Sequence, residues 1–168
     1  RHLPFPAERG LRPTPDRGRG ALFNWLGQDL SGRRCLDLFA GSGALGFEAL
    51  SRGAAEVVLV EHSRAVAAAL RENAGRLGAH GCRLVGGDAP HFLRDAGAGR
   101  FDLVFVDPPY DSGLAVAALA CLPARLAPGA LVYVESDGPI EPGPPWRVRR
   151  HARAGGVHYR LLEIGEEA

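Results

Sequence analysis

The tetrapeptide Asp107-Pro108-Pro109-Tyr110 combines groups that could hold a planar amine for reaction. The exocyclic amine of a nucleic-acid base is a poor nucleophile, because its lone pair is delocalised into the ring. A carboxylate and a backbone carbonyl can orient its N–H groups, and Asp107 and Pro108 supply one of each. The prolines restrict the loop, and Tyr110 offers a flat face for a base taken out of its stack. The alternative is a structural turn at the end of a strand.

A second motif runs from Asp37 through Gly41, Gly43 and Gly46, at the spacing of the glycine fingerprint between a strand and a helix. Glycines allow a tight turn and close approach of a ligand to the backbone, and the following helix presents free N–H groups. A pyrophosphate gains nothing from the nearby Asp37 carboxylate, whereas a ligand with a cationic amino-acid end does. S-adenosylmethionine (SAM) is such a ligand, and the run from Asp37 to Gly43 resembles the first motif of SAM-dependent methyltransferases. The alternative is a glycine turn that binds nothing.

Two further acids follow the next predicted strands. Glu61 lies 20 residues after Gly41 and is expected to accept hydrogen bonds from both ribose hydroxyls of an adenosyl cofactor. Asp88 is expected to accept from the adenine amino group, with the backbone of Ala89 beside the ring. Each acid could instead cap a helix. The expected cofactor site comprises Asp37, Phe39, Ala40, Gly41, Ser42, Gly43, Glu61, His62, Asp88 and Ala89.

Strands and helices alternate along the chain in a way that would place these motifs at one edge of a sheet. Apolar runs predict strands over 35–39, 56–61, 82–85, 101–106 and 130–135, and helical periodicity predicts helices over 44–51, 63–77, 90–94 and 112–126. The segments 146–153 and 157–164 predict an antiparallel hairpin. Such βα units followed by a hairpin indicate the Rossmann-like α/β fold of class I SAM-dependent methyltransferases, with a mostly parallel sheet whose chemistry lies at the carboxyl ends of the strands.

The N-terminal segment is rich in proline, glycine and arginine. We expect residues 1–28 to form a basic arm with a short helix, which Asp16 could cap, and residues 29–168 to form one methyltransferase domain. Candidate RNA-binding residues in the arm are Arg12, Thr14, Arg17 and Arg19. The alternative is that these residues pack on the helix that carries Phe23 and Trp25.

Composition narrows the class of protein. The 168 residues are 46% apolar and 23% charged, as is usual for a soluble globular domain. The net charge of +1 excludes a polycation, so any RNA affinity must come from a local patch. Cys35, Cys82 and Cys121 are scattered, which predicts reduced thiols and no metal site. The sequence shows no apolar run long enough for a membrane span and no signal peptide, so we expect a cytoplasmic monomer.

Taken together, the motifs resemble one bacterial family. The segments that carry the resemblance are Leu11–Arg17, Leu22–Leu26, Asp37–Gly46, Phe105–Tyr110 and Tyr133–Glu135, together with the closing hairpin. They look like the RsmD-type 16S ribosomal RNA guanine-N2 methyltransferases, and the resemblance covers nearly the whole chain. It implies SAM as cofactor, catalysis at Asp107, Pro108, Pro109 and Tyr110, and 16S rRNA in an assembling small subunit as substrate.

Three other functions remain open at this stage. An adenine-N6 DNA or RNA methyltransferase could use the same tetrapeptide. A nucleotide-dependent oxidoreductase is disfavoured by Asp37 and by the loop at Asp107. A non-catalytic RNA-binding assembly protein is disfavoured because a binder need not keep an acid at position 107.

Overall fold

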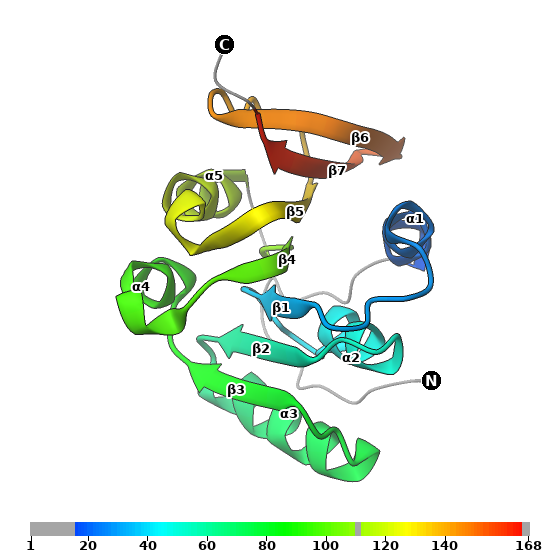
Figure 1. Cartoon of the computed structure of the whole chain (residues 1–168), viewed down its shortest axis with the longest axis vertical. Coiled ribbons are helices and arrows are strands. Elements are labelled where there is room, and N and C mark those ends of the chain that lie inside the picture. The colour runs from blue at the N-terminus through cyan, green and yellow to red at the C-terminus, as the bar shows by residue number, and fades with distance from the viewer. Residues whose placement is uncertain (1–15, 110–111, 166–168) are drawn as a thin grey trace.

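The predicted apolar runs form the strands of one mixed sheet. The computed structural model describes residues 16–109 and 112–165, and in this part seven strands lie in the order β3-β2-β1-β4-β5-β7-β6 (Figure 1). Their bounds are Arg34–Asp37 (β1), Glu56–Glu61 (β2), Cys82–Gly86 (β3), Phe101–Val106 (β4), Leu126–Ser136 (β5), Trp146–Ala154 (β6) and Val157–Ile164 (β7). Strands β1 to β5 are parallel to one another, and β7 is antiparallel to both β5 and β6. The α/β fold with a parallel sheet and a closing antiparallel hairpin is thereby confirmed.

Helices cover both faces of this sheet. They span Asp16–Leu26 (α1), Ala44–Ser51 (α2), Arg64–Leu77 (α3), Ala89–Arg94 (α4) and Ser112–Cys121 (α5). One hydrophobic cluster joins alternate strand residues to α4 and α5, and the other joins the intervening residues to α1, α2 and α3. We call the two sides the α4–α5 face and the α1–α3 face. None of the described helices is long and apolar enough to cross a bilayer.

The strand order reverses between β1 and β4, which are adjacent and parallel. The chain leaves β1 for α2 on the α1–α3 face and leaves β4 for α5 on the opposite face. Connections that depart in opposite directions open a crevice at the carboxyl ends of these two strands, and open α/β sheets bind their ligands at such a point. Both sequence motifs therefore end at the same crevice.

The structure corrects one predicted boundary. The helix expected over 112–126 ends at Cys121, and a 3-10 turn, η2 (Pro123–Arg125), leads directly into β5 at Leu126. Pro123 lacks an N–H and cannot continue the helical hydrogen-bond ladder, so it starts the turn instead. The strand consequently begins at Leu126 rather than at position 130. A second 3-10 turn, η1 (Ala96–Ala98), precedes β4, and the side chain of Asp16 lies outside what the structure describes.

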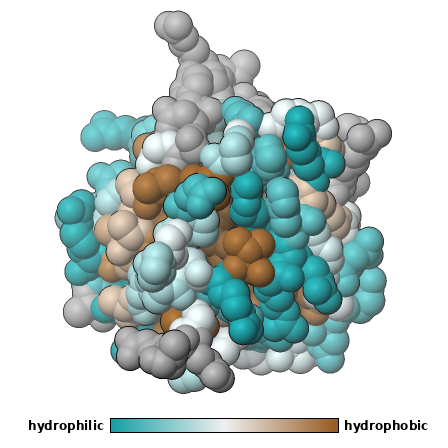
Figure 2. Space-filling view, turned by 90° about the horizontal axis from the view of Figure 1, so that it is seen from above, coloured by the Kyte–Doolittle hydropathy of each residue, from teal (hydrophilic) through white to brown (hydrophobic). Residues whose placement is uncertain are grey.

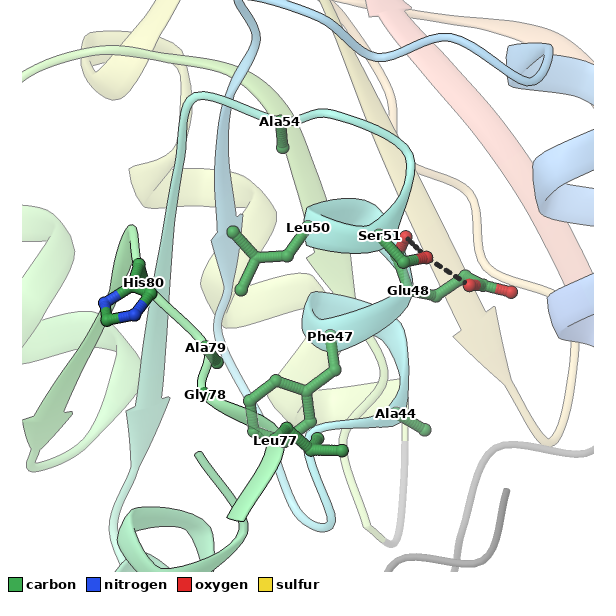
Figure 3. Close-up of a pocket in the computed structure, with 10 residues that line it drawn as sticks. All are labelled: Ala44, Phe47, Glu48, Leu50, Ser51, Ala54, Leu77, Gly78, Ala79 and His80. Carbon is green, nitrogen blue, oxygen red and sulfur yellow. Dashed lines mark hydrogen bonds between the residues drawn. The ribbon is translucent and has the colours of Figure 1, made fainter. Parts of the chain in front are cut away.

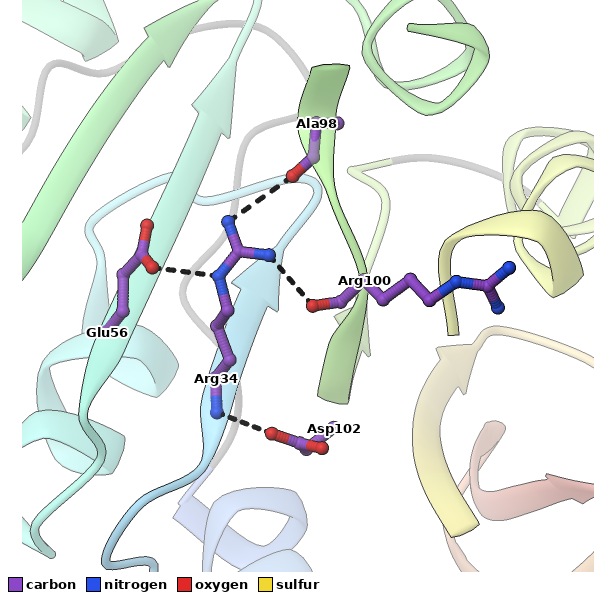
Figure 4. Close-up of polar contacts among 5 residues, drawn as sticks. All are labelled: Arg34, Glu56, Ala98, Arg100 and Asp102. Atoms are coloured by element: carbon purple, nitrogen blue, oxygen red, sulfur yellow. Dashed lines mark hydrogen bonds and ion pairs between the residues drawn. The ribbon is translucent and has the colours of Figure 1, made fainter. Parts of the chain in front are cut away.

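The amino ends of the central strands are tied together by Arg34 at the start of β1. Its Nε donates to Glu56 Oε2 on β2 at 2.8 Å, and its Nη1 donates to the carbonyl oxygen of Arg100 before β4 at 2.8 Å (Figure 4). Its backbone N–H donates to Asp102 Oδ2 at 2.9 Å, and its guanidinium lies 4.5 Å from the centre of the Phe101 ring. One side chain thus bridges three strands at the edge opposite the crevice.

Candidate active site

Four acidic residues line the carboxyl edge of the sheet on its α1–α3 face. Side chains alternate along a strand, so each of these acids shares the face of the buried residue two positions before it. The four pairs are Cys35 with Asp37, Leu59 with Glu61, Phe105 with Asp107 and Tyr133 with Glu135, and the first residue of every pair belongs to the cluster on the α1–α3 face. Three of these acids were predicted site residues, and the structure brings them together on neighbouring strands.

The pKa of Asp37 is strongly raised by its surroundings. Its side chain is 1% exposed, and its Oδ1 atom has no hydrogen-bond partner among the described residues. Burial and the charge of Asp107 raise the pKa of Asp37 to about 8, against the opposing effect of the backbone N–H of Phe39. A buried carboxylate without a cationic partner is costly, and a bound cation would relieve that cost. The site therefore suits a ligand with a cationic group near Asp37.

The glycine loop that follows β1 is built for close packing. Gly43 has φ of +84°, and a Cβ atom there would lie 2.4 Å from the ring of Phe47. A Cβ on Gly46 would lie 2.4 Å from Leu59 Cδ2 on β2, so this glycine lets α2 approach the sheet. Gly43 is the N-cap of α2 and supplies no side-chain hydrogen bond, whereas the backbone N–H of Gly46 in the first turn donates to the Asp37 carboxylate. The positive end of the helix dipole at this turn favours an anionic ligand group.

Glu61 fixes this loop against β2. Its Oε1 atom accepts the backbone N–H of Gly41 at 3.1 Å, and its Oε2 atom accepts that of Ser63 at 2.9 Å. The exposed His62 ring lies 3.4 Å from the same Oε2 atom. Glu61 is 5% exposed, and each carboxylate oxygen can accept a further hydrogen bond. The structural role that the sequence left open is therefore present, and it leaves acceptor capacity for a ligand hydroxyl.

The remaining predicted cofactor residues lie at the start of α4 and in the loop between β1 and α2. Asp88 is exposed and caps α4, because its Oδ1 atom accepts the backbone N–H of His91 at 2.7 Å. Ala89 beside it is buried. Ala40 is buried with its N–H bonded to the carbonyl of Val60 at 3.0 Å, which holds the loop between β1 and β2. Phe39 packs against the cluster on the α4–α5 face, and Ser42 is half-buried in the loop.

The loop after β4 starts at the point where that strand pairs with both of its neighbours. Phe105 pairs with Asp37 on β1 and with Tyr133 on β5, so Asp107 follows at the open end between them. Pro108 is buried, whereas Asp107 and Pro109 are half-buried. Tyr110 lies outside the described residues, as do Arg12 and Thr14, and the side chains of Arg17 and Arg19 are likewise not described.

Glu135 is a further candidate site residue, which the sequence motifs did not predict. It lies next to the last residue of β5 at 1% exposure, and its Oε2 atom accepts a hydrogen bond from the Tyr133 hydroxyl at 3.1 Å. Burial, with the charges of Glu135 and Asp107, raises the pKa of Tyr133, so this hydroxyl stays protonated. The signal was present in the alternation of 133 and 135 at the end of a predicted strand. It was weak because an acid after an apolar strand is common.

A cavity of about 600 Å³ lies elsewhere, between α2 and the turn that follows α3. Phe47 and Leu50 line it from α2, Leu77 lines it from the end of α3, and His80 lines it from the turn (Figure 3). It contains none of the residues assigned to the cofactor or to catalysis. Among the described residues, no group of three or more His, Cys, Asp or Glu side chains is arranged to hold a metal ion.

Chemically, the crevice presents acceptors on three neighbouring strands and donors at one helix. Asp37 ends β1 and Glu61 ends β2, α2 begins after the glycine loop, and Asp107 directly follows the adjoining β4. Burial raises the pKa of the Cys35 thiol to about 12, so this thiol stays protonated. The arrangement can bind a zwitterionic cofactor on one side and hold an amine donor on the other.

Comparisons with known proteins agree with this geometry. The family described as "Conserved hypothetical protein 95" matches residues 1–163. The ribosomal RNA small subunit methyltransferase D of Escherichia coli is 46% identical, over 97% of this chain and 84% of the relative, and its Haemophilus influenzae counterpart is 39% identical, over 97% and 88%.

The solved structure of yhhF from Escherichia coli, described provisionally as a methyltransferase, is 42% identical with a TM-score of 0.86, and the match covers 98% of this chain and 92% of that one. This likeness agrees with the fold class expected from the sequence. A family match over nearly the whole length, together with these relatives, establishes the assignment: the chain belongs to the RsmD family of bacterial methyltransferases.

Proposed function

We propose that this protein transfers a methyl group from SAM to the exocyclic N2 amine of a guanine in 16S ribosomal RNA. The observation that carries the proposal is the placement of Asp107 at the crevice, one strand away from Asp37. The relatives named as ribosomal RNA small subunit methyltransferases support the RNA substrate. We further propose that the chain acts as a cytoplasmic monomer on assembling small subunits.

The cofactor would be held by the residues around the glycine loop. Asp37 would face its ammonium group, the first turn of α2 its carboxylate, and Glu61 its ribose hydroxyls. Asp88 and the backbone of Ala89, with Phe39, Ala40, Ser42 and His62 nearby, would complete the adenosyl end. These residues fit such a group because Asp37 Oδ1 is buried without a hydrogen-bond partner in the described structure, and because Gly43, the N-cap of α2, has no side chain to occupy the start of the helix. When bound, SAM supplies an electrophilic methyl group on its sulfonium.

The chain's own contribution to the reaction is positioning. Asp107 and the carbonyl of Pro108 would accept the two N–H groups of the target amine and turn its lone pair toward the methyl donor. Pro108 and Pro109 restrict the loop, and Tyr110 would stack on the extruded base. The proton released after transfer would pass to Asp107 or to water.

The test is methyl transfer in vitro followed by nucleoside analysis. Wild-type protein is incubated with radiolabelled SAM and either free 16S rRNA or purified small-subunit particles, and the digested RNA is analysed by mass spectrometry. N2-methylguanosine is the expected product. Formation of N6-methyladenosine would instead support the adenine-N6 alternative. Absence of methyl transfer to either RNA substrate would overturn the proposed function. Comparing the substrates also shows whether naked RNA suffices.

A further inference from the structure

The C-terminal hairpin, formed by β6 and β7, carries a high concentration of positive charge. Residues 146–164, which form β6, β7 and their turn, contain five arginines and a single acid, in a chain whose net charge is only +1. Figure 2 looks onto the molecule from above, the side on which β6 and β7 lie in Figure 1, and hydrophilic residues dominate that surface. The five arginines are Arg147, Arg149, Arg150, Arg153 and Arg160.

Acid pairing separates these arginines into two groups. Arg147 and Arg149 share Glu163 on β7, with Arg147 Nε 2.8 Å from Oε1 and Arg149 Nη1 3.5 Å from Oε2. Arg150 and Arg153 are exposed and form no ion pair with any described residue, although Arg153 Nε donates to the carbonyl of Gly155 at 2.9 Å. Two guanidinium groups at the edge of the sheet are therefore available to an external anion.

A buried cationic group lies behind this edge. Arg160 on β7 is 7% exposed, its Nη1 atom has no hydrogen-bond partner among the described residues, and its Nη2 atom lies 3.4 Å from His158 Nδ1. The same His158 nitrogen lies 3.1 Å from His151 Nε2, and the two rings stack with their centroids 5.3 Å apart. Burial, with the charges of Arg160 and Arg153, lowers the pKa of His158.

No acid within the described structure makes an ion pair with this group. Glu141, in the loop before β6, acts on Arg160 only as a more distant opposite charge. The buried Arg160 guanidinium has no paired acid, which is unfavourable, and an anion bound at the edge would offset this cost. This independent feature indicates the same class of ligand as the two unpaired arginines.

The strand register places the arginines of β6 at the same height along the strands as Asp107. Val106, just before Asp107, pairs with Val134 on β5, and Val134 pairs with Arg160 on β7. Arg160 pairs in turn with His151 on β6, two residues before Arg153. At the usual spacing of strands, the three steps from β4 to β6 amount to about 14 Å. An extended nucleic acid with one base at Asp107 could therefore reach the arginines of β6.

We propose that the outer edge of β6 binds the phosphate backbone of the substrate RNA beside the reacting nucleotide, through Arg153 on the face of the sheet that Arg160 shares and through Arg150 on the other face of the same strand. This inference rests on the proposed function, since it takes RNA as the substrate. The competing interpretation is that the arginines only keep an exposed edge strand from pairing with other chains, for which a charge of either sign serves.

The experiment compares variants that separate these two roles. Arg150→Gln with Arg153→Gln neutralises the edge, and Arg150→Glu with Arg153→Glu reverses its charge while keeping it charged. The matched controls carry the same changes at Arg71 and Arg83, which are exposed on α3 and on β3, the opposite edge of the sheet. Affinity for a fluorescently labelled fragment of 16S rRNA is measured across a salt series, with SAM affinity and oligomeric state measured on the same samples.

We expect the neutralised variant to bind RNA at least about tenfold more weakly, with the salt slope reduced by about 1.4–1.8, and the reversed variant to bind more weakly still. SAM affinity and the monomeric state should match wild type, and the control variants should bind RNA normally. Wild-type affinity and slope in both edge variants would overturn the inference, as would an equal loss in the controls. Binding is scored apart from methylation, so wild-type protein that methylates neither substrate would count against the proposed function alone.

Discussion

Asp37 ends β1 and Asp107 directly follows β4, the adjacent parallel strand, and the charge of Asp107 raises the pKa of Asp37. Because Asp37 is also buried, its pKa rises from an ordinary value of 3.8 to about 8. The carboxyl group that should hold a cationic cofactor is thus protonated at neutral pH when no cation is present. This coupling between the cofactor side and the amine side of the crevice leads to measurable pH effects.

We expect the stability of the cofactor-free protein to fall as pH rises between about 4 and about 8. In that window the folded protein binds the Asp37 proton and the unfolded chain does not, so the unfolding free energy decreases with pH by up to about 1.4 kcal/mol per unit. Asp37→Asn removes this titration, so its stability should exceed that of wild type increasingly toward pH 8. Urea denaturation at several pH values measures the difference.

Asp95→Asn serves as a control, because Asp95 is an exposed acid at the end of α4. It should leave the pH profile of wild type unchanged. Asp37→Asn should also weaken SAM binding, since the variant cannot supply the negative charge. A parallel pH profile in wild type and Asp37→Asn would show that this carboxyl group does not titrate in the stated window.

Glu61→Ala should weaken SAM binding by roughly 1–3 kcal/mol, because charge-assisted hydrogen bonds to the ribose are lost. It should also lower the unfolding free energy, since the backbone N–H groups of Gly41 and Ser63 lose their acceptor. Glu56→Ala is the matched control, because Glu56 lies at the other end of β2 and pairs with Arg34. The control should reduce stability but not SAM affinity, and calorimetry with an unchanged affinity for Glu61→Ala would remove Glu61 from the cofactor site.

Replacing Arg12, Arg17 and Arg19 of the arm with Ala should weaken RNA binding and flatten its salt slope, with SAM affinity little changed. The reason is that phosphate contacts release counterions, and the net charge of +1 requires local sources of attraction. Filter binding over a salt series is the measurement. Wild-type affinity combined with a lower melting temperature would assign these arginines to packing.

Much of the fold followed from local patterns, because strands, glycine turns and helix periodicity are short-range signals. The glycine loop could be placed for the same reason, since Gly43 and Gly46 fill positions where a side chain would collide. The end of α5 was predicted wrongly, because the apolar run continues past Cys121 through Pro123. The missing N–H of Pro123 ends the helix although the apolar pattern continues.

What the sequence did not provide depends on pairing between distant segments. Glu61 holds the backbone of Gly41 only because β2 lies beside β1, and the stacking of His151 on His158 depends on the register of β6 with β7. The charge at the β6 edge was visible as a run of arginines. Its level relative to Asp107 became apparent only from three successive strand pairings.

Arg34→Ala should destabilise the protein by about 1–3 kcal/mol, because it removes hydrogen bonds to β2 and to the segment before β4. Arg34→Lys should recover little of this loss, since an ammonium cannot reproduce the planar fork. The KM for SAM should be unchanged below the melting transition, as Arg34 lies at the edge opposite the crevice. Thermal denaturation and steady-state kinetics test both statements, and a large change in KM would contradict the separation of the two edges.

Asp107→Ala should lower kcat for methyl transfer by at least about 10²-fold while leaving SAM affinity largely intact, because Asp107 would contact the target amine more than the cofactor. Asp102→Asn, near the amino end of β4 and so at the opposite edge of the sheet, is the control and should retain turnover. Asp107→Ala carries a second readout that does not depend on substrate. It removes a charge that raises the pKa of Asp37, so the decrease of stability with pH should move to lower pH. Near wild-type turnover in Asp107→Ala would show that the loop is structural, and an unshifted stability profile would show that the two acids do not interact.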